Sequence, residues 1–139
     1  SGCNHPSIEY GEYLSTLAGC TWCHTPINAT QQSIPEQSLA GGHEFTIGTF
    51  VVRAGNISSD KETGIGNWSL DQFIARFRQY QGERGRTIPL GEDGFNSLMP
   101  WTMYADITDE DLGAIYTFLM QSEPRSNEVT TYERLGSKL

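Results

Sequence analysis

Apolar side chains recur three or four residues apart in three segments of the chain, a pattern that predicts three amphipathic helices. The first helix is expected over residues 8–18, the second from Ser69 until Gly82 and Gly85, and the third from Thr108 until Pro124. The expected buried faces consist of Tyr10, Tyr13, Leu14 and Leu17, of Leu70, Phe73, Ile74 and Phe77, and of Leu112, Ile115, Tyr116 and Leu119.

Two of these segments carry signals for the start of a helix. Ser69 is followed three residues later by Gln72, which predicts a capping box. Thr108 precedes three consecutive acidic residues, Asp109 to Asp111, which favour the first turn of a helix because of the helix dipole. We therefore expect the second and third helices to begin at these two positions.

Long polar segments separate the helices. Residues 25–42 and 82–100 are rich in glycine and proline and are expected to be loops. The alternating, β-branched residues 45–52 predict an extended stretch or a short hairpin. We expect one domain over residues 1–124 and a polar tail over residues 125–139. An all-α domain with such long loops is unusual, unless the loops wrap a rigid, flat, apolar object.

A haem would be such an object. The sequence contains Cys20-Thr21-Trp22-Cys23-His24, and C-x-x-C-H is the signature of covalent haem attachment. Two thiols at this spacing reach the two vinyl groups on adjacent edges of one porphyrin. The next residue can then turn its imidazole under the iron. We therefore predict one haem c, bound through Cys20 and Cys23, with His24 as an axial ligand.

Two other kinds of protein site also use a pair of closely spaced cysteines. A thioredoxin-like redox pair is expected within a βαβ unit, and no such pattern is visible. A zinc site needs two further ligands. The remaining candidates show no paired spacing; they are Cys3, His5 and His43. Haem attachment is therefore favoured over both alternatives.

The second axial ligand is not fixed by the motif. Met99 is favoured because the following Pro100 restricts the backbone at a loop position. Met103 is its main rival. The weaker candidates are Met120, which fits ordinary packing, and the histidines His5 and His43.

Several landmarks resemble a large group of bacterial class I cytochromes c. They are Gly11-Glu12-Tyr13-Leu14 and Ala18 to Pro26, Leu39 to Gly42, Asn56-Ile57-Ser58, Thr63 to Trp68, Met99-Pro100-Trp101 with Tyr104, and Thr108 to Tyr116. The group includes cytochrome subunits or domains of periplasmic quinoprotein and flavoprotein dehydrogenases.

The resemblance covers about residues 9–122 and implies the class I fold. In that fold the N- and C-terminal helices cross beside the haem, a third main helix closes the pocket, and Met99 is the sixth ligand. Gly55 stands where many relatives have proline, and the loop 79–98 is longer and more acidic than usual. Relatives often carry two or three haems, whereas one signature here implies one haem.

Polar residues are also expected around the haem. Asn56, Trp68 and Arg86 are candidates to bond or pack on the haem propionates, with plain packing and solvent exposure as alternatives for Trp68 and Arg86. A calcium loop at Asp60 and Glu62 is disfavoured, because the segment lacks a regular alternation of oxygen ligands.

The formal net charge of −8 argues against nucleic acid as a partner and favours basic or neutral redox proteins. No apolar run is long enough to span a bilayer. Cys3, after two small residues, is a candidate lipid anchor, with a free thiol or an intermolecular disulfide as alternatives. Haem attachment implies an extracytoplasmic location; the oligomeric state is left open.

An iron bound by both histidine and methionine has no open position. The expected function is therefore one-electron transfer without catalysis, between periplasmic or membrane-associated partners. The alternatives are a haem subunit docked in a larger dehydrogenase through the polar tail, and a haem enzyme or gas sensor with a labile sixth ligand.

Overall fold

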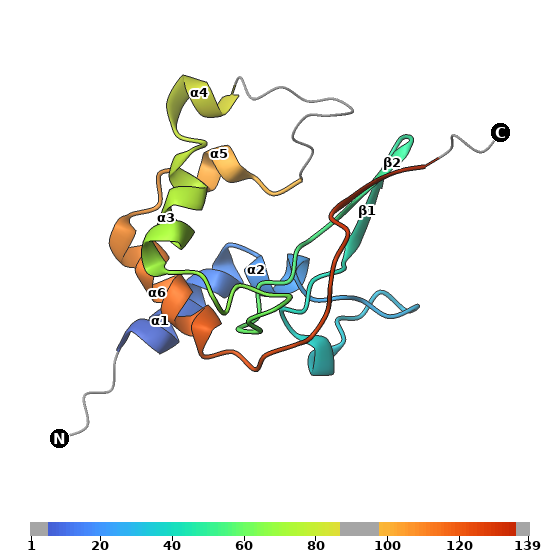
Figure 1. Ribbon diagram of the computed structural model, residues 1–139, viewed down its shortest axis with the longest axis horizontal. Helices are drawn as coiled ribbons and strands as arrows, with labels where there is room; N and C mark the ends of the chain where they lie inside the picture. Colours follow the sequence, from blue (N-terminus) through green and yellow to red (C-terminus); the bar gives the residue numbers. More distant parts are fainter. Residues whose placement is uncertain (1–5, 87–97, 136–139) are drawn as a thin grey trace.

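The computed structural model describes residues 6–86 and 98–135, which are mostly helical with a small antiparallel sheet. Figure 1 shows α1, α3, α5 and α6 on one side and the β1–β2 hairpin on the other. The helices are α1 (Pro6–Leu17), α2 (Cys20–Cys23), α3 (Leu70–Arg78), α4 (Gly82–Arg86), α5 (Trp101–Tyr104) and α6 (Asp109–Met120), with a 3-10 turn η1 (Pro35–Gln37). The strands are β1 (Glu44–Ile47), β2 (Phe50–Arg53) and β3 (Tyr132–Arg134).

Helices α1 and α6 cross at very short range. A β-carbon on Gly11 of α1 would lie 2.0 Å from the backbone oxygen of Ala114 in α6, so only glycine fits at the crossing. Beside it, the Tyr10 hydroxyl donates a 2.9 Å hydrogen bond to Asp111 Oδ1. The two terminal helices therefore pack directly on each other, as the resemblance implied.

Replacing Gly11 by alanine is expected to destabilise the protein by about 1–3 kcal/mol, the usual cost of overpacking. The new methyl group meets backbone, which cannot move aside without separating α1 from α6. Chemical denaturation would measure the change in the free energy of unfolding. Gly113→Ala is the matched control, because a β-carbon there meets nothing within 4 Å. It should raise stability by about 0.5–1 kcal/mol, since alanine favours helix.

The face of α1 that contacts the core differs from the expected one. Tyr10, Tyr13 and Leu17 are 41%, 59% and 67% exposed, whereas Gly11 and Ser15 are buried. Of the four residues expected on the buried face, Leu14 packs partly against the core. The reason is the close crossing: small side chains must face α6, so the large ones turn outward.

Helix α3 begins as predicted. The Ser69 side chain accepts a hydrogen bond from the Gln72 N–H, and the Gln72 side chain accepts one from the Ser69 N–H. Thr108 likewise caps α6 by accepting from the Asp111 N–H. These helices contribute most of the buried core, which consists of Leu39, Ile65, Phe73, Phe77, Leu112, Ile115 and Leu119.

The expectation of an all-α domain was incomplete. The predicted hairpin forms, with Glu44 opposite Arg53 and Ile47 opposite Phe50. A third strand, β3, then pairs antiparallel with β2 and places Tyr132 opposite Val52. Within the segment 82–100 that was expected to be loop, α4 forms; residues 87–97 lie outside the described part.

The described part of the expected C-terminal tail, residues 125–135, packs on the domain. Asn56 Nδ2 donates to the carbonyl oxygens of Arg125 and Asn127 at 2.7 and 3.0 Å. Asn127 Nδ2 donates to Ala40 O at 2.9 Å. Figure 1 shows this segment returning from α6 to run beside β2. Among the described residues, no helix has the length and apolar character needed to cross a membrane.

Candidate haem site

A cavity of about 630 Å³ lies between the helices and the hairpin. Its volume falls within the range of about 300–1,000 Å³ that is usual for cofactor sites. The wall is mainly apolar and draws on α3, α6, β2, β3 and the loops between them; it includes Val52, Ile57, Ile65, Phe73, Phe77, Ile115 and Leu119. Cys20, Cys23, His24 and Met99 all line it.

One turn of helix brings the motif residues to this wall. Gly19 adopts a left-handed conformation (φ +78°), which lets the chain turn from α1 into α2. The Cys23 N–H then donates to Gly19 O, and the His24 N–H to Cys20 O, both at 2.9 Å. The cysteines and the histidine therefore reach the cavity from one short element.

A backbone contact fixes the orientation of His24. Its Nδ1 lies 2.7 Å from Gly55 O, and because a carbonyl can only accept, Nδ1 carries the proton. Nε2 therefore keeps its lone pair. Burial lowers the pKa of His24, which favours the neutral imidazole that a metal requires.

Gly41 helps to hold Gly55 beside His24. It has φ +76° and donates its N–H to His24 O at 2.7 Å. A β-carbon at Gly41 would lie 2.5 Å from the Gly55 carbonyl, so the two backbones meet without room for a side chain. The landmark Leu39 to Gly42 thus connects the motif to the loop that orients the imidazole.

The cysteine environments do not resemble those of a redox-active thiol pair. Burial raises the pKa of Cys20 to about 11 and also raises the pKa of Cys23. Thioredoxin-like catalysis needs a lowered pKa and a thiolate. Among the described residues, no three His, Cys, Asp or Glu side chains lie close enough together to hold a metal ion.

The candidates for the sixth ligand separate clearly by position. Met99 is half-buried and lines the cavity, whereas Met103 is 75% exposed and lies outside its wall. Met120 packs against the core. His43 is buried and stacked on Phe45, which lines the cavity, but His43 itself does not line it. His5, like Cys3, lies outside the described residues.

The three candidates for propionate contacts have different surroundings. Trp68 and Asn56 line the cavity. The Asn56 amide is already engaged within the protein: Nδ2 donates to the C-terminal segment and to Thr63, and Oδ1 accepts from Ser58. Asn56 therefore holds the loop 56–63 to residues 125–127. Arg86 ends α4, and its side chain is not among those described.

Asp60 has a structural task that needs no calcium. Its carboxylate accepts hydrogen bonds from the Thr63 N–H at 2.8 Å and the Thr63 hydroxyl at 2.6 Å. These bonds lower the pKa of Asp60 and close a turn. The Glu62 side chain is exposed, and a hydrogen bond from the Glu62 backbone adds to the lowering of the Asp60 pKa.

Several lining residues were not expected from the sequence. The helical spacing could have predicted Arg76 as a lining residue, because it lies three residues after Phe73 on the inward face of α3. Arg53, Thr131 and Tyr132 reach the cavity through the β2–β3 pairing. No local signal marks them, since strand pairing over about 80 residues depends on the tertiary fold.

The donor set fits a haem c. Two thiols, an imidazole with a lone pair at Nε2 and a thioether converge on one apolar cavity of suitable size. Covalent attachment needs the thiols, and axial ligation of iron by His and Met is an established cytochrome arrangement. The same cavity thus has the groups that would attach a haem and those that would bind its iron.

Comparison with known proteins gives several relatives. The chain is 32% identical over 113 residues to the cytochrome c subunit of the quinone alcohol dehydrogenase of Gluconobacter oxydans, covering 81% of this chain and 21% of that subunit. It is 31% identical over 117 residues to the gluconate 2-dehydrogenase cytochrome c subunit of Pantoea cypripedii (84% and 23%). It is 31% identical over 118 residues to the fructose dehydrogenase cytochrome subunit of Gluconobacter japonicus (84% and 21%).

The chain spans about a fifth of the length of these relatives. No protein-family model matches it. The similarity therefore concerns one segment of each relative, at modest identity, and that segment corresponds to most of this chain.

Proposed function

The chain is a homologue of the cytochrome c subunits of bacterial dehydrogenases, and on this premise we propose that it transfers single electrons through one covalent, His/Met-ligated haem c. One observation carries the proposal: Cys20, Cys23, His24 and Met99 line the same apolar cavity. The assigned fold is that of a class I cytochrome c, extended by the β1–β2–β3 sheet.

Each of the four residues has a distinct task. Cys20 and Cys23 would hold the haem through thioether bonds, each made by addition of S–H across a vinyl group without an oxidant. His24 would hold the iron through Nε2, while Gly55 O accepts from Nδ1. Met99 would hold it through sulfur. When bound, haem supplies a one-electron iron couple, and methionine ligation raises its reduction potential relative to a second histidine.

The walls of the cavity keep the site apolar and rigid. Phe73 and Phe77 of α3 and Ile115 and Leu119 of α6 are buried core residues that also line it. A packed wall of this kind excludes water and leaves the ligands little freedom to rearrange when the charge of the site changes by one. The chain accordingly acts as an electron carrier and not as a catalyst.

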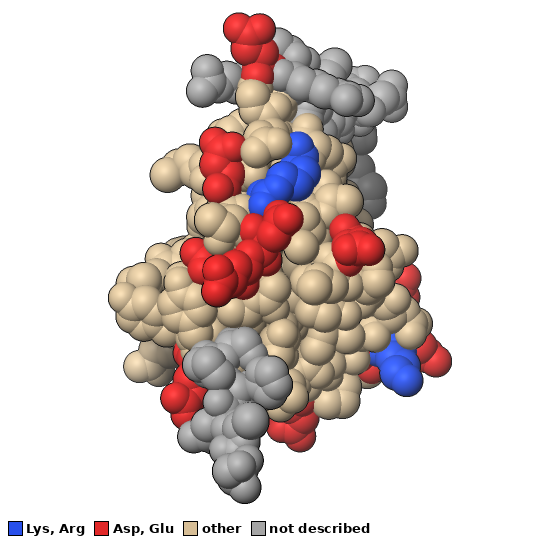
Figure 2. Space-filling view, turned by 90° about the vertical axis from the view of Figure 1, so that its left-hand side faces the viewer, with Lys and Arg blue, Asp and Glu red and all other residues tan. Residues whose placement is uncertain are grey.

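The partners are redox proteins, in line with relatives that are subunits of dehydrogenases. They lie outside the cytoplasm, where haem is attached to C-x-x-C-H motifs in bacteria. Figure 2 shows more acidic than basic atoms on the helical side of the molecule, with one stretch of basic atoms near the centre and a second basic group at the lower right. A net charge of −8 suits a partner with a basic docking surface. Cys3 remains a candidate for a membrane tether, and docking within a larger dehydrogenase is the alternative setting.

Carbon monoxide distinguishes this proposal from a haem enzyme or gas sensor. The purified haem protein is expected to be reduced and reoxidised reversibly in a potentiometric titration with a one-electron slope. The ferrous form should show no spectral change with carbon monoxide at neutral pH, because Met99 fills the sixth position. Rapid formation of a carbon monoxide complex would instead support an open or labile site.

A further inference from the structure

Helix α5 is a single turn that directly follows the candidate ligand Met99. It comprises Trp101–Tyr104, has no side-chain N-cap and begins after Pro100. A helix this short is not stable alone, because nucleation costs more than one turn of hydrogen bonds contributes. The position of α5, and with it the position of Met99, must therefore come from contacts with other elements.

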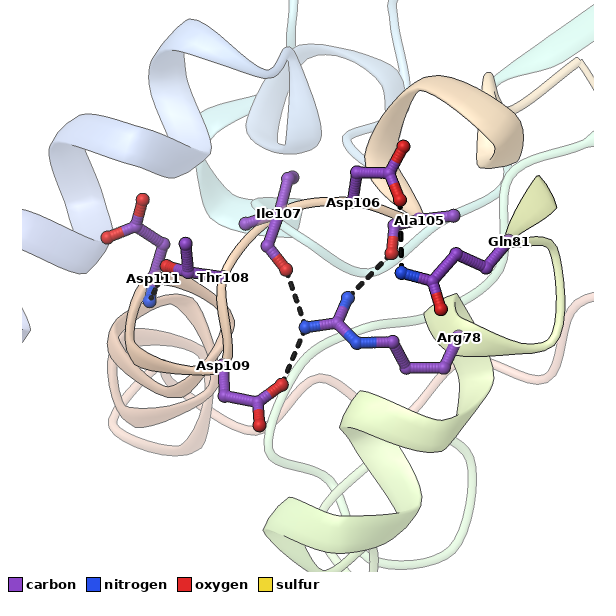
Figure 3. A network of polar contacts seen from close by, with 8 residues as sticks. All are labelled: Arg78, Gln81, Ala105, Asp106, Ile107, Thr108, Asp109 and Asp111. Carbon is purple, nitrogen blue, oxygen red and sulfur yellow. Dashed lines mark hydrogen bonds and ion pairs between the residues drawn. The ribbon is translucent and has the colours of Figure 1, made fainter.

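The C-terminal end of α5 is held by Arg78, the last residue of α3 (Figure 3). Arg78 Nη1 donates to Ala105 O at 2.7 Å, and Nη2 donates to Ile107 O and to Asp109 Oδ1, both at 2.6 Å. Ala105 is the C-cap of α5 and is fully buried. One guanidinium thus joins the end of α5 and the start of α6 to α3.

These contacts amount to more than a surface ion pair. The Asp109 side chain is 76% exposed, so its charge interaction with Arg78 is weakened by solvent. The two backbone carbonyls, in contrast, need the planar fork of an arginine to be bonded together. Figure 3 also shows Gln81, whose Nε2 donates to Asp106 Oδ1 at 3.0 Å and makes a second link to the same connection.

The N-terminal end of α5 is held by aromatic packing on α3 and the residues after it. The Trp101 ring lies 5.2 Å from Phe77 and is stacked on Tyr80 at 4.9 Å. The Arg76 guanidinium lies over the Trp101 ring, 4.7 Å from its centroid, and Nη1 donates to the Tyr80 hydroxyl at 2.6 Å. Trp101 follows Met99 by only two residues, so this packing acts close to the ligand.

Helix α3 is a firm support for both contacts. Its first turn is closed by the capping box, and its residues Phe73 and Phe77 are buried. On the opposite side, the Tyr104 hydroxyl donates to Ala18 O, just before the attachment motif. Helix α5 therefore lies between α3 and the segment that carries the cysteines.

We propose that Arg78 and Arg76 are positioning residues for the sixth iron ligand: they hold α5 at its two ends on α3 and thereby keep Met99 at the cavity. The inference rests on the proposed function, because it takes Met99 as the ligand. The two arginines differ in how they act, since Arg78 bonds backbone carbonyls and Arg76 packs on Trp101.

Imidazole binding to the ferric haem protein tests the proposal with Arg78→Gln. Imidazole can bind only while Met99 is off the iron, so its apparent dissociation constant falls as that open fraction rises. Loss of the fork is expected to lower this constant about tenfold, with covalent haem content unchanged. Arg78→Lys should keep the dissociation constant closer to the wild-type value than Arg78→Gln does. Arg76→Gln should also lower the constant.

The control is Ser122→Ala, which removes the hydrogen bond that the Ser122 hydroxyl accepts from the Ser59 N–H and the one that it donates to Leu119 O, without touching α5. It should leave the imidazole constant at the wild-type value. If the wild type shows the far-red sulfur–iron absorption band but Arg78→Gln and Arg76→Gln bind imidazole as the wild type does, the inference is wrong while the proposed function stands. If the wild type lacks that band, the ligand assignment is wrong, and the inference fails with it.

Discussion

A Cys20→Ala/Cys23→Ala double variant is expected to carry no covalently bound haem when it is produced alongside the wild type in a host that matures c-type cytochromes. The two thiols face the same cavity from one turn of helix, and no other described cysteine is available. Haem-dependent peroxidase staining after denaturing electrophoresis measures the loss, which should be nearly complete.

The single variants refine this expectation. Cys20→Ala and Cys23→Ala should each retain haem through one thioether, with a shifted absorption maximum in alkaline pyridine. Thr21→Ser, within the same motif, is the matched control and should mature as the wild type does. Equal haem staining in the double variant and the wild type would show that the cysteines do not attach the cofactor.

The second large effect is expected from Met99→Ala. The ferric variant should lose the far-red sulfur–iron band, bind carbon monoxide when reduced, and have a reduction potential lower by on the order of 0.1 V or more. Axial ligands set haem potentials over a span of about 0.8 V, so removal of a thioether has a large effect. Absorption spectroscopy and potentiometry measure these changes.

Met103→Ala is the matched control for this result. Met103 lies four residues from Met99 but is 75% exposed, and it does not line the cavity. Its variant should keep the band and the wild-type potential. If Met103→Ala loses the band and Met99→Ala keeps it, the two methionines have the opposite roles.

The helices and their start points could be predicted because the signals are local. Ser69 and Gln72 form the predicted capping box, and Thr108 caps α6. The attachment motif could also be identified locally, since all of its groups lie within one turn of helix. Met99 was favoured over Met103 from the neighbouring Pro100, and the cavity is lined by Met99.

The remaining features depend on contacts between distant segments. The predicted buried face of α1 was wrong because hydrophobicity alone does not reveal a crossing so close that a glycine must face α6. Strand β3 was missed because three residues carry little periodicity and its pairing partner lies about 80 residues earlier. The group that orients His24 is the backbone carbonyl of Gly55, and the sequence does not reveal it because every residue has such a carbonyl.

The most direct measurement of the central claim is extraction of the matured wild-type protein with acidified organic solvent, followed by an absorption spectrum of the reduced protein in alkaline pyridine. If Cys20 and Cys23 both bind the porphyrin, the colour stays with the protein and the spectrum is that of a haem with two thioether bonds. Colour that passes into the solvent, or a protein that is colourless from the start, would contradict the account.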